Sequence, residues 1–157
     1  NALPVGDNLI HREVCLTATC PHYGLHESAL HLVFHCPFAV QIWNAAPLAG
    51  FLNPSSISSI REGVTLVNKL VCLPPSGIGE GPLAPWLIWM IWTARNQLIF
   101  NKIKLVAADC LVLGLIRARE WQEAQRSLPP KLTPIRSVSI LDPPQAFALK
   151  SSLMPLE

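Results

Sequence analysis

The sequence predicts a mostly α-helical protein in which a small Cys- and His-rich module precedes about three to four helices and a Pro-rich tail. All five His and three of the five Cys fall within the first 36 residues. Further along, apolar residues recur at steps of three and four, and no segment of any length alternates at period two. Six Pro occur without a sustained period in 128–157, which we expect to be disordered.

The first half of the chain contains two of the expected helices. Residues 1–14 are expected to form an extended, polar lead-in. Cys36 and Pro37 predict a helix start, because Pro at the first helical position lacks only an N–H that has no partner there. This helix is expected to end before Pro47. A second helix is predicted over 57–71, with Ser55 and Ser56 as its cap, because Ile and Val recur there at helical spacing.

The other two expected helices follow a linker at 73–82. One runs from about 85 to 100 and the other from about 106 to 126. The longest apolar run, at 83–92, is about half the ~20 residues needed to span a bilayer. We therefore expect a buried or partner-facing helix and no membrane partner.

The domain division that we expect is the Cys- and His-rich module at 1–46, a helical connecting region at 47–127 and the tail at 128–157. The chain starts without Met, so we expect it to be a piece of a longer protein. Five Cys is an odd number and no signal peptide precedes them, which favours reduced thiols in a nuclear or cytoplasmic setting over a secreted protein.

Positive charge gathers in residues 95–136, which hold eight Lys and Arg against three Asp and Glu. Such a segment is able to lie along the phosphates of a nucleic acid. An exposed, solvated helix face explains the same charges, and charge alone favours it. The candidate nucleic-acid contacts are Arg95, Lys102, Lys104, Arg117 and Arg119.

The Cys- and His-rich segment has part of the spacing of a zinc site. Zn²⁺ takes four N or S ligands, and the four residues between His31 and Cys36 suit one half of such a site. The other half should be a C-x2-C pair, but Tyr23 stands three positions after Cys20, and a phenol keeps its proton until about pH 10. Cys15 is chemically the best substitute.

Other nearby groups leave the ligand set open. His22, His26 and His35 also lie close in the sequence, although His22 is too near Cys20 for the usual knuckle turn, which needs two intervening residues. Spacing alone fits equally well with no metal site, in which Cys20 and Cys36 are small buried apolar residues.

Four ordered motifs are similar to the reverse-transcriptase zinc-binding domain of plant LINE-type non-LTR retrotransposons. They are LPVGDNL (3–9), CP-x-x-G (20–24), ES-x-x-H (27–31) and FHCPFAVQIW (34–43). LAPWLIWMIWTARNQLIFN (83–101) and AREWQEAQ (118–125) resemble the connector towards the RNase H domain of those polyproteins. The resemblance implies metal ligands at Cys20, His31 and Cys36, with Tyr23 in the fourth position.

The resemblance also implies a function. It indicates a non-catalytic, zinc-binding fragment that associates with RNA or DNA beside the polymerase or RNase H domain of the same polyprotein. No phosphate-binding Gly loop, G-x-S-x-G elbow or paired carboxylates with an adjacent base occur in the sequence, so we do not expect an enzyme. The alternative is a metal-free helical interaction scaffold, a decayed transposon copy without retained activity.

Overall fold

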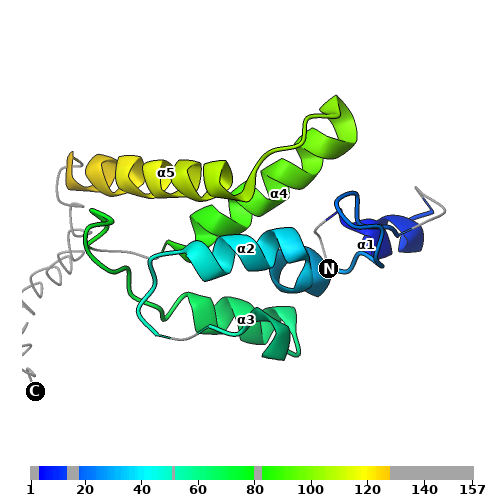
Figure 1. The fold of residues 1–157 in the computed structure, drawn as a ribbon, viewed down its shortest axis with the longest axis horizontal. Helices are drawn as coiled ribbons and strands as arrows, with labels where there is room; N and C mark the ends of the chain where they lie inside the picture. Colours follow the sequence, from blue (N-terminus) through cyan, green and yellow to red (C-terminus); the bar gives the residue numbers. More distant parts are fainter. Residues whose placement is uncertain (1–3, 14–17, 51, 80–82, 128–157) are drawn as a thin grey trace, which may run out of the picture.

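The computed structural model describes residues 4–13, 18–50, 52–79 and 83–127, and it is mostly helical, as predicted. The expected tail at 128–157 and Cys15 lie outside these ranges. Within them the β-structure is limited to two isolated bridges, Thr19 with His26 and Leu48 with Cys72. In Figure 1, α2 lies between α3 and α5, and α1 lies at one end. The elements are α1 (Gly6–His11), a π-helical turn (His31–His35), α2 (Pro37–Ala45), a 3₁₀ turn (Pro54–Ser56), α3 (Ile60–Val67), α4 (Ala84–Asn101) and α5 (Ala107–Ser127).

Helix α2 forms the centre of the apolar core. It begins at Pro37 as predicted, and Phe38 and Ile42 are among its buried side chains. The indole Nε1 of Trp43 donates a hydrogen bond to the Val33 carbonyl at 2.7 Å, so this large ring is buried with its polar atom satisfied. The same ring stacks on Phe34 at a centroid distance of 5.6 Å. These contacts hold the π-helical turn against α2.

Helix α3 is shorter than predicted and has a different cap. Its N-cap is Ser59, whose Oγ accepts a hydrogen bond from the Glu62 amide at 3.2 Å. The Glu62 carboxylate in turn accepts from the Ser58 amide, which makes a variant of a capping box and explains the start. Ser55 and Ser56 belong instead to the preceding 3₁₀ turn. Val71, the last residue of the predicted stripe, lies beyond the helix and is exposed.

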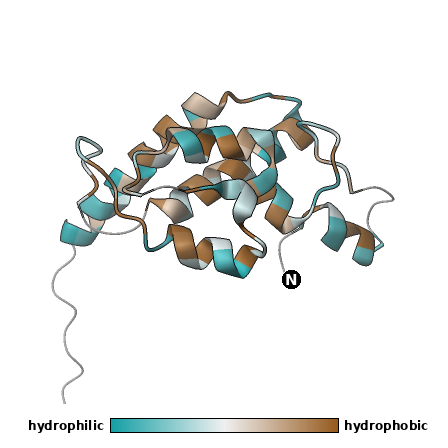
Figure 2. Ribbon diagram, turned by 60° about the horizontal axis from the view of Figure 1, so that its bottom comes forward, coloured by the Kyte–Doolittle hydropathy of each residue, from teal (hydrophilic) through white to brown (hydrophobic). Residues whose placement is uncertain are grey.

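Helices α4 and α5 pack closely against each other. Gly114 makes this approach possible, because a Cβ added there would lie 2.8 Å from Leu87 Cδ2. Ala118 and Gln122 are buried on the same side of α5, as the helical period predicts. The last turns of α5 are mostly hydrophilic (teal in Figure 2). No helix in the described ranges is both long and apolar enough to cross a membrane.

The N-terminal segment differs from the extended lead-in that we predicted, because residues 6–11 form α1. A six-residue segment shows too little periodicity to predict a helix, and this one depends on tertiary contacts. The Gly6 amide donates to Glu27 Oε2 at 2.9 Å, and the Asp7 amide donates to the Glu27 carbonyl at 3.2 Å. Glu27 therefore anchors the start of α1.

Gly6→Ala is expected to reduce the free energy of unfolding by about 1–3 kcal/mol. A Cβ at Gly6 would lie 2.7 Å from the Cα of Ala18, so backbone must move, and the Ala18 carbonyl is also the acceptor of the Glu27 amide. Urea unfolding monitored by Trp fluorescence measures the change. Gly79→Ala is the matched control, because a Cβ at Gly79 meets nothing within 4 Å. Equal stability of the two variants would contradict the prediction.

Candidate metal centre

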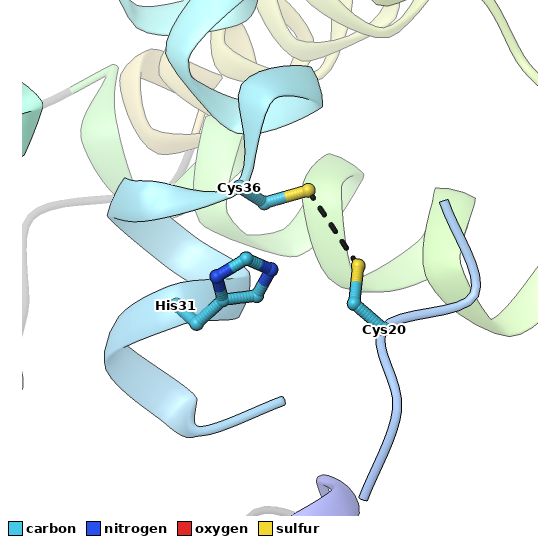
Figure 3. A group of neighbouring side chains, drawn as sticks. All are labelled: Cys20, His31 and Cys36. Carbon is cyan, nitrogen blue, oxygen red and sulfur yellow. Dashed lines mark hydrogen bonds between the residues drawn. The ribbon is translucent and has the colours of Figure 1, made fainter. Parts of the chain in front are cut away.

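Cys20, His31 and Cys36 come together in the structure, although they are spread over 17 residues of sequence. One ligand atom from each side chain lies within 4.8 Å of the other two. The two sulfurs are 3.8 Å apart, and both Cys are buried. Figure 3 shows the His31 ring beside the two thiols, which point toward each other. The arrangement matches the part of the zinc pattern that the sequence contains.

The π-helical turn places two of these side chains. Cys36 is the N-cap of α2, and its amide donates to the His31 carbonyl at 2.6 Å. This i to i+5 hydrogen bond is the one that defines a π turn, a conformation that is frequent at functional sites. The π turn thereby brings the imidazole of His31 and the thiol of Cys36 close together.

A tight turn places the third side chain. The Cys20 carbonyl accepts the Gly24 amide at 2.8 Å, and the Cys20 amide donates to the Leu25 carbonyl at 2.6 Å. Gly24 has φ of +70°, a left-handed conformation that glycine adopts without steric cost. The backbone amides of His22 and Tyr23 also hydrogen-bond to the Cys20 sulfur. Backbone donors around one sulfur stabilise its thiolate form.

The thiols of Cys20 and Cys36 form a hydrogen bond with each other. The hydrogen bond from Cys36 lowers the pKa of Cys20 to about 5, and the nearby His31 side chain and the backbone amides act in the same sense, against the effect of burial. The same hydrogen bond to Cys20, together with burial, raises the pKa of Cys36. Cys20 is therefore the sulfur that carries negative charge first, and a thiolate is the form of Cys that binds metals.

The donor set fits a zinc ion. Nε2 of His31 is buried and has no hydrogen-bond partner among the described residues. Leaving a buried nitrogen without a partner costs about 1–3 kcal/mol, and coordination would remove that cost. Two thiolates and one imidazole are ligands that Zn²⁺ prefers. Cys20, His31 and Cys36 would hold the ion, and the ion would supply folding energy by joining the turn at Cys20 to the start of α2.

Tyr23 does not join this cluster. It follows Cys20 by three residues, where the family pattern has a ligand, but its side chain is 48% exposed. Cys15, the substitute that we predicted, lies outside the described residues. The other two Cys lie elsewhere, and burial raises the pKa of Cys110 to about 11, which keeps this thiol protonated.

A buried ion pair joins the Cys- and His-rich segment to α4. Glu27 is 0% exposed and Arg95 is 4% exposed. Glu27 Oε1 accepts from Arg95 Nε at 3.0 Å, and Oε2 accepts from Nη2 at 2.6 Å. Arg95 also lies over the Trp92 ring, 5.3 Å from its centroid. The prediction that Arg95 contacts nucleic acid is therefore wrong, because its guanidinium is buried and paired. Glu27 was missed, and its place in the ES-x-x-H motif was the available signal.

The other four predicted cations are exposed, but they do not form one cluster with the metal-ligand candidates. Lys102 and Lys104 lie in the connection between α4 and α5, and the charge of Lys104 lowers the pKa of His22, after the larger effect of burial. Arg117 and Arg119 lie on α5, which extends away from α1 (Figure 1). Arg117 pairs with Glu120 at 2.8 Å, and Arg119 Nε donates to the Ser76 carbonyl.

The comparisons with known proteins bear on the N-terminal segment. Comparison with curated proteins gave no match, and comparison with solved structures gave none either. Residues 1–43 match a family model described as zinc-binding in reverse transcriptase. The matched segment contains Cys20, His31 and Cys36 and ends within α2. The match and the geometry together support a reverse-transcriptase zinc-binding domain in this part of the chain.

Proposed function

We propose that the chain is a non-catalytic part of a retrotransposon reverse-transcriptase polyprotein, of the plant LINE-type non-LTR class, that binds Zn²⁺ and associates with RNA or DNA. The observation that carries the proposal is the Cys20, His31 and Cys36 cluster inside the segment that matches the family. The zinc has a structural role in this proposal, because it cross-links a turn and a helix start. Polymerase and RNase H chemistry would reside in other domains of the polyprotein.

The nucleic-acid contact is assigned to Tyr23, in the turn that follows Cys20, and to Lys102 and Lys104, in the connection between α4 and α5. All three side chains are exposed. Tyr23 adjoins His22, whose pKa responds to the charge of Lys104, so the turn at Cys20 and the α4–α5 connection are within electrostatic reach. An exposed aromatic ring stacks on unpaired bases, and nearby Lys side chains neutralise phosphates. This combination favours single-stranded nucleic acid.

Replacing Lys102 and Lys104 with Gln is expected to weaken binding of single-stranded RNA and to make it less dependent on salt. Each lost phosphate contact should reduce the slope of log K against log salt concentration by about 0.7. Fluorescence anisotropy between about 50 and 200 mM salt measures this slope. Arg117→Gln is the control, because Arg117 is paired with Glu120 on α5. An equal loss from the control, or no binding by the wild type at the lowest salt, would contradict the assignment.

A metal-free interaction scaffold is the second candidate, and a specific observation favours it. Helix α5 exposes several large apolar side chains, namely Val112, Leu113, Ile116 and Trp121. The polymerase or RNase H domain of the same polyprotein would cover them. In this case chelation should leave the far-UV circular dichroism and the stability of the chain unchanged, and RNA should not bind even at low salt.

A further inference from the structure

We propose that His22 supplies the fourth ligand of the metal centre, in the place of the Cys that Tyr23 replaces. The inference rests on the proposed function, since it concerns the same site. Structural zinc sites are almost always four-coordinate, and the described cluster offers three ligand atoms. A fourth donor is therefore needed, and its chemistry is restricted to the nitrogen, sulfur or oxygen atoms that lie near Cys20 and Cys36.

His22 carries an available nitrogen. The buried side-chain nitrogens without a hydrogen-bond partner in the described ranges are Nε2 of His31 and Nε2 of His22. Buried polar groups are normally hydrogen-bonded, so each such nitrogen needs an explanation, and an absent ion is one of the recognised explanations. His31 already lies in the cluster. One ion would account for both nitrogens.

The other nearby His side chains are engaged elsewhere. His26 is exposed and its Nε2 lies 2.9 Å from the Asp7 carboxylate. His35 Nε2 forms a 2.9 Å hydrogen bond with the Ile57 carbonyl. His11 is exposed at the end of α1. His22 is thus the remaining described imidazole with a buried free nitrogen.

His22 contacts both Cys-bearing segments, although its nitrogens are not among the clustered ligand atoms of Cys20, His31 and Cys36. Its backbone amide hydrogen-bonds to the Cys20 sulfur, and its ring stacks on Phe38 with a centroid distance of 4.4 Å and an interplanar angle of 12°. His22 follows Cys20 by two residues and Phe38 follows Cys36 by two residues, so the stack joins the same two segments as the 3.8 Å contact between the sulfurs.

The sequence spacing argued against His22 for a reason that does not apply to this arrangement. A knuckle turn needs two residues between its ligands because both ligands point inward from the same turn. The His22 ring instead stacks on Phe38 at the start of α2, the helix whose N-cap is Cys36. Two thiolates and two imidazoles make a Cys₂His₂ set, which is one of the common structural zinc sites.

X-ray absorption at the zinc edge of the zinc-loaded wild-type chain tests the inference without any substitution. Two sulfur ligands with the multiple scattering of two imidazoles are the expected result. Three sulfurs and one imidazole would overturn it in favour of Cys15, and two sulfurs, one imidazole and an oxygen would overturn it in favour of water or Tyr23. A chain that binds no zinc at all would overturn the proposed function itself.

Substitutions provide a second readout through Co²⁺ binding to the full chain. His22→Ala is expected to weaken Co²⁺ binding by more than roughly 100-fold, which is the largest loss expected for a residue that only hydrogen-bonds to a metal ligand. It should also reduce the intensity of the tetrahedral d–d bands. His26→Ala is the matched control, because that ring is exposed. His22→Cys is expected to restore tight binding and to increase the thiolate-to-cobalt charge-transfer absorption. Unchanged affinity and spectra in His22→Ala would overturn the inference.

Discussion

Replacing Glu27 with Gln is expected to lower the free energy of unfolding by about 3–5 kcal/mol, because it leaves the Arg95 guanidinium buried without its counter-charge. The carboxylate accepts both Arg95 hydrogen bonds and the Gly6 amide, and it is fully buried. The same change should therefore loosen α1 as well as the contact with α4. Chemical denaturation gives the stability, and amide hydrogen exchange at residues 6–11 shows the local effect.

Two comparisons separate this account from a general effect of losing charge. Glu120→Gln removes the partner of Arg117 in an exposed pair and should cost less than about 1 kcal/mol. The double variant Glu27→Leu with Arg95→Met should recover much of the lost stability, because a buried ion pair replaced by apolar side chains is often neutral. Similar losses in Glu27→Gln and Glu120→Gln would show that the buried pair has no special role.

Cys36→Ser is expected to abolish zinc binding and with it the stabilisation that zinc gives. Cys36 offers a sulfur to the cluster and is also the N-cap of α2, so its replacement disconnects the helix from the turn at Cys20. The melting temperature of the wild type should fall on chelation, whereas that of Cys36→Ser should not respond to zinc or chelator. Differential scanning calorimetry with and without zinc measures this.

Cys72→Ser is the matched control for that experiment. It makes the same chemical change at a half-buried thiol outside the cluster, so zinc should still stabilise this variant. If Cys72→Ser lost its response to zinc as completely as Cys36→Ser, the cluster would not be the binding site.

The sequence predicted the elements that have strong local signals. Helices α2, α4 and α5 follow from Pro at a helix start and from apolar residues at helical spacing, and their observed bounds lie close to the predicted ones. Helix α1 has no such signal, because its six residues depend on hydrogen bonds to Glu27. The start of α3 was assigned to Ser55 and Ser56, whereas the capping pattern of Ser59 and Glu62 determines it.

The candidate site was only partly accessible from the sequence. Spacing left the ligand set open, the family resemblance implied Cys20, His31 and Cys36, and the structure brings the three together. Spacing gave no information on which cations are exposed, so Arg95 was taken for a surface residue when it is the partner of Glu27, 68 positions earlier. This pairing depends on how α4 packs against the N-terminal segment, and local sequence patterns do not predict contacts between residues so far apart in the chain.

The zinc content of the wild-type chain tests the central claim most directly. The protein would be refolded with zinc, dialysed against metal-free buffer and analysed by inductively coupled plasma mass spectrometry. The metal centre formed by Cys20, His31 and Cys36 predicts about one zinc per chain, lost in Cys36→Ser and retained in Cys72→Ser. A wild-type chain that is folded, binds no zinc and has the same stability with and without chelator would contradict it.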